Sequence, residues 1–227
     1  MPDYRGLAIT PLSFGTVSTD DLFCEKEQAL FTFYADNKER YKHALDIGAN
    51  VGVHTCLMLR QGWEVRAFEP DPLHFNALVD NLIQNGLIDD ENLLEVARQA
   101  VSDKNGRAEF VRVLNNTTGN HLEGDKTPYG PLARITVGLR DCRPLFKWAD
   151  FAKIDCEGHE AKLLCSVTDE PCHFMVEVGN PKNAHAIYEH FKGKRKMTAQ
   201  RLGWNEVKTY DDMPTHHSDG ALFVGAR

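Results

Sequence analysis

The chain has no run of about 20 apolar residues, which is the length that a membrane-spanning helix needs. It also has no excess of basic residues, because 26 Lys and Arg stand against 33 Asp and Glu and give a net charge of −7. This balance disfavours general binding to the phosphates of nucleic acids. The first residues, MPDYR, are polar and do not form a secretion signal. We therefore expect a cytoplasmic protein without membrane contact, and we disfavour nucleic acid as its partner.

Cysteine pairs of the C-x-x-C type are absent as well, although the chain contains six cysteines. That spacing would be typical of zinc sites and redox motifs. Several of the cysteines lie within apolar runs, as small buried side chains do. We expect free thiols in a reducing compartment, without a disulfide framework or a zinc site. The six are Cys24, Cys56, Cys142, Cys156, Cys165 and Cys172.

The composition that remains is that of an ordinary globular protein, with 42% hydrophobic and 26% charged residues. A length of 227 residues suits one domain with a full core. We therefore expect a single domain over residues 1–227. Within it, residues 1–42 would form a flanking or lid segment, with a helix-like pattern at 21–35, and residues 43–227 would form an α/β core.

Short apolar runs alternate with helical patterns along the core, which is typical of a parallel sheet covered by helices on both faces. We predict a doubly wound, Rossmann-like, mostly parallel α/β sheet. The last two strands have a short connection, so they should pair antiparallel at one edge. Strands are expected at 43–47, 64–68, 93–97, 107–113, 150–155, 173–178, 205–210 and 220–226, and helices at 53–61, 72–85, 159–165 and 184–191.

A long segment without a regular pattern, 114–142, interrupts this alternation. Loops of such length inside compact domains are usually functional or disordered. We expect a substrate-binding flap here, with a solvated insertion as the alternative.

The most informative segment is ALDIGANVGVHT at 44–55, whose pattern predicts a strand, a glycine turn and a helix start. Gly48 and Gly52 let the backbone turn sharply and let a ligand approach closely. A dinucleotide fingerprint counted from Gly48 would need glycines where Asn50 and Val53 stand, so it is excluded. The spacing D-x-G-x-N-x-G resembles instead the first motif of class I methyltransferases that use S-adenosylmethionine (SAM). A turn that only packs strand against helix is the alternative.

An acid, Glu69, follows the second predicted strand about 20 residues after Gly48. A carboxylate at this place can accept hydrogen bonds from both hydroxyls of a ribose. A surface acid before a proline turn is the alternative. The third predicted strand leads to Ala100 and Val101, which would supply an apolar face and a backbone N–H beside an adenine.

A second strand, glycine turn and helix start is predicted at 151–160, FAKIDCEGHE. Asp155 and Glu157 are two residues apart, so they share one face of an extended backbone. His159 and Glu160 follow at the start of the helix. Titratable groups gathered at the carboxyl end of a sheet indicate an active site. Capping of the helix N-terminus by one of the acids is the alternative.

The pair of motifs DIGANVG at 46–52 and KIDCEGHE at 153–160 resembles the FkbM family of class I SAM-dependent methyltransferases. The second motif of that family usually reads KIDVEGHE, so this chain differs only at Cys156. The resemblance covers roughly residues 43–180. It implies the class I methyltransferase fold and methyl transfer to a hydroxyl oxygen of a saccharide or small metabolite.

The resemblance also implies a SAM site around the first glycine turn and the ends of the neighbouring strands. Transfer of a methyl group to an alcohol needs a base or a metal that activates the hydroxyl. We assign no metal ligand; a magnesium or manganese ion held by the acids and histidine of the second motif and by Glu177 is the alternative. The residues assigned to cofactor binding are Asp46, Gly48, Ala49, Asn50, Gly52, Thr55, Glu69, Pro70, Ala100, Val101 and Asp155, and those assigned to catalysis are Glu157, His159 and Glu177.

Two other functions remain open at this point. An RNA methyltransferase would use the basic run KGKRK at 192–196 as its footprint, although the net charge argues against it and a solvated loop explains the run. A methyltransferase-fold subunit that binds a partner without catalysis is the other, although both motifs keep the residues that the chemistry needs. The pair His216 and His217 is expected in a polar hairpin loop.

Overall fold

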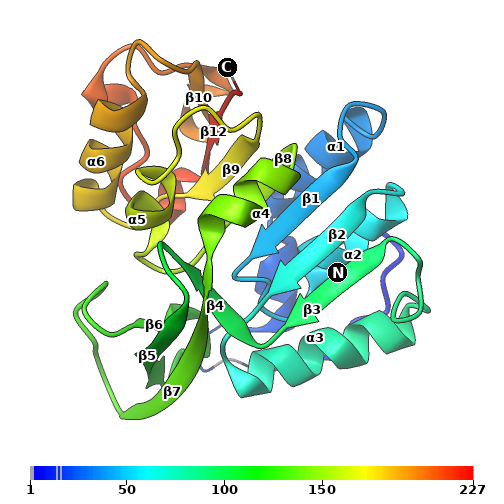
Figure 1. Cartoon of the computed structure of the whole chain (residues 1–227). Coiled ribbons are helices and arrows are strands. Elements are labelled where there is room, and N and C mark those ends of the chain that lie inside the picture. Colours follow the sequence, from blue (N-terminus) through cyan, green and yellow to red (C-terminus); the bar gives the residue numbers. More distant parts are fainter. Residues whose placement is uncertain (1–2, 14, 16, 227) are drawn as a thin grey trace.

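The central sheet of the protein contains eight strands, and the five from β9 to β3 run parallel to one another (Figure 1). The computed structural model describes residues 3–13, 15 and 17–226. The predicted mostly parallel α/β sheet is confirmed. The order across it is β11 (Asn205–Glu206), β10 (Met197–Ala199), β12 (Ala221–Val224), β9 (His173–Glu177), β8 (Phe151–Ile154), β1 (His43–Ile47), β2 (Glu64–Phe68) and β3 (Leu93–Ala97).

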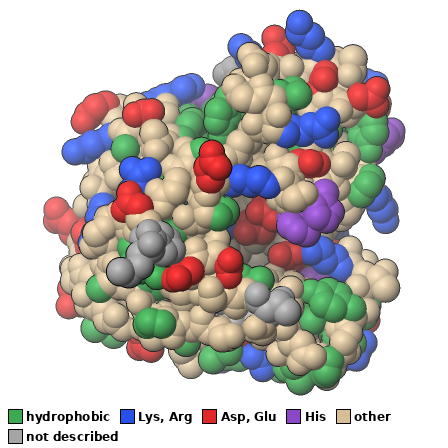
Figure 2. Space-filling view, turned by 180° about the vertical axis from the view of Figure 1, so that it is seen from behind, with side chains coloured by type: hydrophobic (Ala, Val, Ile, Leu, Met, Phe, Trp, Pro, Cys, Tyr) green, Lys and Arg blue, Asp and Glu red, His purple; other side chains and the backbone are tan. Residues whose placement is uncertain are grey.

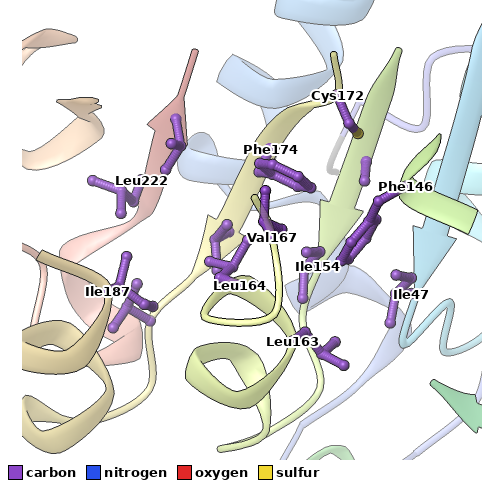
Figure 3. Packing of buried hydrophobic residues seen from close by; sticks show 14 of the residues in the cluster. Ile47, Phe146, Ile154, Leu163, Leu164, Val167, Cys172, Phe174, Ile187 and Leu222 are labelled. Carbon is purple, nitrogen blue, oxygen red and sulfur yellow. The ribbon is translucent and has the colours of Figure 1, made fainter. Parts of the chain in front are cut away.

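Helices cover both faces of this sheet. Alternate residues of the central strands point to opposite sides, so each face of the sheet packs against its own set of helices. Leu45 and Ile47 of β1 belong to one buried cluster, and Ala44 belongs to the other. Figure 3 shows the first cluster, in which Phe146 and Phe174 pack with aliphatic side chains between strands and helices. Its helices are α4 (Cys142–Trp148), α5 (Glu160–Leu164) and α6 (Pro181–Phe191); those of the second cluster are α1 (Glu25–Asp36), α2 (Val53–Arg60) and α3 (Pro72–Gln84).

Local signals explain where these helices begin. Asp71 caps α3 by accepting hydrogen bonds from the backbone of Leu73 and His74, and Pro72 occupies the first helical position. Asn180 and Pro181 play the same parts at the start of α6. The helix-like pattern at 21–35 forms a short 3₁₀ helix, η1 (Thr19–Phe23), followed by α1.

A second, four-stranded sheet contains part of the segment that was expected to be irregular. Its order is β4 (Gln99–Ser102), β7 (Leu132–Asp141), β5 (Gly106–Val113) and β6 (His121–Leu122). The expectation of a loop over 114–142 is therefore wrong at its end, where β7 leads directly into α4. Most of β7 is only partly covered, so the strand lacks the continuous apolar run that marks the strands of the central sheet. Before β7, the segment contains η2 (Thr117–Gly119) and β6.

The second sheet is fastened to the first through Asp71, which is fully buried. Its carboxylate accepts hydrogen bonds from Arg112 of β5 and, at 3.0 Å, from the side chain of Asn120. Because Asp71 also caps α3, a single carboxylate joins the end of β2, the start of α3 and the second sheet.

The antiparallel edge of the central sheet is also arranged differently from the expectation. The two last predicted strands do not pair with each other, because β10 lies between them: β12 pairs with β9 and β10, and β11 pairs with β10. The strand expected at 205–210 is reduced to β11, since the chain turns into a 3₁₀ helix, η4, at Tyr210–Asp212. Two further 3₁₀ helices, η3 (Gln200–Leu202) and η5 (His217–Asp219), shape the segments beside β12.

All six cysteines have free thiols, as the sequence predicted. In the described part of the chain, every helix is too short or too polar to cross a membrane.

The aromatic cluster around Phe151 gives a test of the second core. Phe151 is fully buried, and its ring lies 5.0 Å from that of Tyr41 and 5.6 Å from that of Trp63. We expect Phe151→Ala to lower the free energy of unfolding by about 3–5 kcal/mol, since it removes a ring from a closely packed site. Urea denaturation measures this, and Leu94→Ala at an exposed position should change it by less than about 0.5 kcal/mol. Equal effects of the two substitutions would contradict this core.

Candidate functional site

A cavity of about 600 Å³ opens at the carboxyl ends of the central strands. This volume lies within the range of small-molecule sites. Figure 2 shows a hollow in this face of the molecule, with acidic side chains inside it and basic and histidine side chains beside its opening. Residues from the ends of four neighbouring strands form its floor, namely Gly48 after β1, Glu69 after β2, Asp155 and Glu157 after β8, and Glu177 of β9.

The turn after β1, here called the β1 turn (residues 48–52), lies against the backbone that follows β8. Gly48 has a φ of +74°, and a Cβ atom added to it would lie 1.8 Å from the carbonyl oxygen of Asp155. The backbone N–H of Asp155 donates to the carbonyl of Ile47 at 3.0 Å. Any side chain at position 48 would therefore push the two motifs apart.

The residues assigned to this turn divide into two groups. Gly48 and Asn50 line the cavity. The others lie behind the turn and do not line it: Ala49 donates its N–H to the carbonyl of Phe68, Gly52 faces Leu78 of α3, and Thr55 donates to buried Asp46 at 2.6 Å. For Asp46, Ala49, Gly52 and Thr55, the structure thus shows support of the turn and no surface that faces the cavity.

Glu69 occupies the place that the sequence predicted, at the cavity wall. Its two carboxylate oxygens accept hydrogen bonds from the backbone N–H groups of Asn50 and Asp71, each at 2.8 Å. Burial of the side chain raises the pKa of Glu69 to about 8, although these two hydrogen bonds act in the opposite direction. Pro70, Ala100 and Val101 line the adjoining wall, as assigned.

The turn after β8, here called the β8 turn (residues 155–159), presents Asp155, Glu157 and His159 to the cavity. Glu157 has a φ of +55° and forms an ion pair with Lys126. The imidazole of His159 is bonded on both sides, with Nδ1 at 2.8 Å from Asp125 and Nε2 at 3.0 Å from the hydroxyl of Ser102.

Helix capping, the alternative for the acids of this motif, is not seen, because no described side chain caps the start of α5. Glu160 instead holds the turn that precedes the helix. Its buried carboxylate accepts the backbone N–H groups of Gly158 at 2.9 Å and Cys156 at 3.2 Å. Asp155 and Glu157 are left facing the cavity.

A buried lysine lies between the acids of the floor. The ammonium of Lys153 donates to the carbonyl of Gly48 at 3.1 Å and lies 3.4 Å from Asp155 and 3.8 Å from Asp46. Burial alone would lower the pKa of Lys153, but the charges of Asp155, Asp46 and Glu27 raise it above its ordinary value. Lys153 is therefore a fixed positive charge under the cavity.

The surroundings of Glu177 disfavour its charged form, whereas those of Lys153 stabilise the charged form. Burial, followed by the neighbouring charges of Asp155 and Glu27, raises its pKa well above the ordinary value of a glutamate. The surroundings of Glu177 thus favour the protonated form more than those of an ordinary glutamate do.

Several cavity residues were not singled out from the sequence. Glu27 of α1 lies 3.1 Å from Nε2 of His54, whose Nδ1 is hydrogen-bonded to buried Tyr34 at 2.8 Å. Lys153 stands inside the second motif and could have been chosen on that ground. The cavity also contains Lys26, Lys126 and His217, which come from segments with no recognisable motif.

One buried oxygen beside the cavity points to a ligand. Oδ1 of Asn50 has no hydrogen-bond partner within the described part of the chain. Buried polar atoms are normally satisfied, and Asn50 lines the cavity, so a ligand with hydrogen-bond donors suits this floor. No group of three or more His, Cys, Asp or Glu side chains in the described residues is placed to hold a metal ion.

Comparison with known proteins yields similar folds and one family. The FkbM methyltransferase of Methylobacillus flagellatus has 14% identity and a TM-score of 0.47, over 81% of this chain and 43% of that one. This chain thus spans less than half the length of that protein. A human methyltransferase 10 domain-containing protein has 14% identity and a TM-score of 0.49, over 97% and 88% of the two chains. An O-methyltransferase of Bacillus cereus, solved in complex with S-adenosylhomocysteine (SAH), has 11% identity and a TM-score of 0.49, over 88% and 81%.

No curated protein matches the chain. The model of the methyltransferase FkbM domain matches residues 46–196. This match includes the β1 turn and the β8 turn and extends over more than half of the sequence, and the chain therefore belongs to the FkbM family of methyltransferases.

Proposed function

We propose that this methyltransferase binds SAM in the cavity and transfers its methyl group to a hydroxyl oxygen of a saccharide or small metabolite. The observation that carries the proposal is that Glu69 and the acids of the β8 turn line one cavity. The family supports methyl transfer, and the polar floor supports the cofactor and the class of acceptor.

The residues of the cavity suit the parts of SAM in turn. Glu69 would accept the ribose hydroxyls, while Pro70, Ala100 and Val101 would cover the adenine with an apolar wall. The buried oxygen of Asn50 lies in the β1 turn, where the amino group of the methionine part would supply a donor. When bound, SAM supplies a methyl group on a positively charged sulfur, and its carbon–sulfur bond breaks as the acceptor oxygen forms the new bond.

Glu157 is the residue best placed to take the proton of the acceptor hydroxyl. It faces the cavity after β8 and is not committed to helix capping. His159 is held between Asp125 and Ser102, so we assign it a positioning role that fixes the β8 turn. Glu177 of β9 also lines the cavity and would orient the acceptor through a hydrogen bond.

Lys153 would keep the floor in place for this chemistry. It links the carbonyl of Gly48 with the carboxylate of Asp155, and thus the two turns with each other.

RNA is the weaker alternative as an acceptor. In the basic run 192–196, Arg195 is buried and donates to the carbonyl oxygens of Glu170 and Cys172, and Lys192 forms an ion pair with Glu189. The run lies outside the cavity lining, so its charge serves the fold at the end of α6 and does not form a footprint beside the site.

Removal of Lys153 is expected to destabilise the protein strongly. Lys153→Met leaves the buried carboxylate of Asp46 and the neighbouring Asp155 without their cation, which costs about 3–5 kcal/mol of unfolding free energy. Lys162→Met, at an exposed pair with Asp103, should cost about 0–1 kcal/mol. Urea denaturation of both variants measures this, and a Lys153→Met protein as stable as the control would contradict the role of the lysine.

SAH binding is expected to depend on pH through Glu69. Below a pKa of about 8, the ligand-free carboxyl is protonated, whereas donation by ribose hydroxyls favours the carboxylate, so binding releases a proton. Affinity should therefore rise between pH 6 and pH 8, by up to about tenfold per pH unit. Glu69→Ala should weaken binding by about 1–3 kcal/mol, and Glu69→Gln should remove the pH dependence.

Calorimetry in two buffers with different heats of ionisation measures both the affinity and the released proton. Glu64→Gln, at the other end of β2, is the matched control and should bind as the wild type does. A wild-type affinity that does not change with pH would contradict the ribose role of Glu69, and an absence of SAH binding would refute the cofactor.

Glu157→Gln keeps the shape of the side chain but cannot take a proton. We expect nearly unchanged SAH affinity and a turnover that falls by roughly 10²–10⁴-fold, the range for general-base catalysis. SAH production with a panel of hydroxylated sugars measures the rate, and Glu206→Gln in exposed β11 is the control. Full activity of Glu157→Gln would rule the base out. Loss of activity on chelation, with recovery on added magnesium or manganese, would instead identify a metal site.

A further inference from the structure

Three basic side chains from distant parts of the chain meet at one side of the cavity. Lys26 lies in the first turn of α1, Lys126 follows β6, and His217 begins η5. All three line the cavity, as Glu27 and Glu177 also do. They are called here the basic rim.

Lys126 lies across the ends of β8 and β9. Its Cγ is 3.2 Å from the position of a Cβ on Gly158, and its Nζ is 4.0 Å from that of a Cβ on Gly179. Its ammonium forms the ion pair with Glu157. The glycine at position 158 thus leaves room for the lysine side chain at the carboxyl edge of the sheet, beside the proposed base.

Lys26 and His217 lie near Lys126, since the charges of both lysines act on His217. The ammonium of Lys26 donates to the carbonyl oxygen of Ser218, the residue after His217. The segment is held by Gln200, which donates to the carbonyl of Lys26 at 3.0 Å and accepts the N–H of Ala221 at 2.9 Å. The rim is therefore fixed by hydrogen bonds between α1, η3 and the start of β12.

The charges of the cavity are balanced unevenly. Lys26 contacts a neutral carbonyl and forms no ion pair with any described carboxylate. Burial lowers the pKa of His217, and the positive charges of His216, Lys126 and Lys26 add to the effect, which places these groups close together. The cavity acids other than Glu177, in contrast, have partners: Glu27 has His54, Asp155 has Lys153, Glu157 has Lys126, Asp21 has Ser18, and Glu69 has two backbone N–H groups.

We propose that the basic rim binds an anionic group of the methyl acceptor, a carboxylate or a phosphate, so that the enzyme methylates an acid-bearing saccharide or metabolite. This inference rests on the proposed function. An anion that enters the cavity meets Lys26, which forms no ion pair with a described carboxylate, and it also reaches Lys126. A cationic acceptor would find acids that, apart from Glu177, are already partnered.

The proposed contact between the acceptor anion and Lys126 also gives a role to the ion pair that Lys126 forms with Glu157, the proposed base. Glu157 is held by Lys126 until an acceptor anion takes over that ammonium. The released carboxylate then faces the acceptor hydroxyl, so that an acceptor with the right charge brings the base into position.

The test uses the full chain saturated with SAH and three sugars of matched size: glucose 6-phosphate, glucuronate and glucose. Calorimetry gives the affinity of each for the wild type, for the double variant Lys26→Gln/Lys126→Gln, and for Lys192→Gln in the exposed pair with Glu189. We expect at least one anionic sugar to bind about tenfold or more tighter than glucose, which is the scale of a hydrogen bond to a charged group. The double variant should lose that advantage and Lys192→Gln should keep it.

Binding of glucose 6-phosphate alone would identify a phosphate, and binding of glucuronate alone a carboxylate; both results support the basic rim. Glucose that binds as well as the two anionic sugars, anionic sugars that do not bind, or a double variant that binds like the wild type would overturn it. In those cases SAH binding, measured first with each protein, stays intact and the proposed function stands. A protein that binds no SAH refutes the proposed function itself.

Discussion

The backbone contact between the two glycine turns is the constraint on which the rest of the site depends. The Cα of Gly48 faces the carbonyl of Asp155 at a distance that no side chain allows, and the N–H of Asp155 is bonded back to β1. Lys153 reinforces the contact from below by its bond to the carbonyl of Gly48. Because β1 and β8 are paired in parallel, this contact brings the proposed cofactor floor and the proposed base to the same edge of the sheet.

The central strands could be predicted from the sequence because both of their faces are covered. β1 and β8 are buried along nearly their whole length, and the bounds found for β1, β2 and β3 are the predicted ones, although β3 at the edge is only partly covered. β7 was missed although Ala133, Ile135, Val137 and Leu139 alternate with polar residues and glycine, a pattern typical of a strand with one covered face. The irregular sequence before it concealed this alternation. β10 has only three residues, too few for any periodic signal.

The candidate site was predictable only where a motif fixes the backbone. Gly48, Glu69, Asp155 and Glu157 stand at the ends of strands, so parallel pairing alone places them together. Ala49 and Thr55 were assigned from proximity in sequence, but the turn directs them away from the cavity. The basic rim and Glu27 could not be found, since they meet only through the packing of α1 and of the segments around η3 and η5. Their positions follow from tertiary contacts such as those of Gln200 and carry no local signature.

The floor and the basic rim of the cavity belong to different kinds of structure. The floor consists of turns at the carboxyl ends of parallel strands, whose backbone is held by bonds between neighbouring strands. The basic rim consists of side chains on a helix start, a surface loop and a 3₁₀ turn, tied together mainly by hydrogen bonds at the surface. Substitutions in the rim therefore leave the core untouched, and a change of acceptor can arise without loss of the cofactor site. In evolutionary terms, one scaffold of this design can diversify into many transferases by varying a handful of peripheral positions.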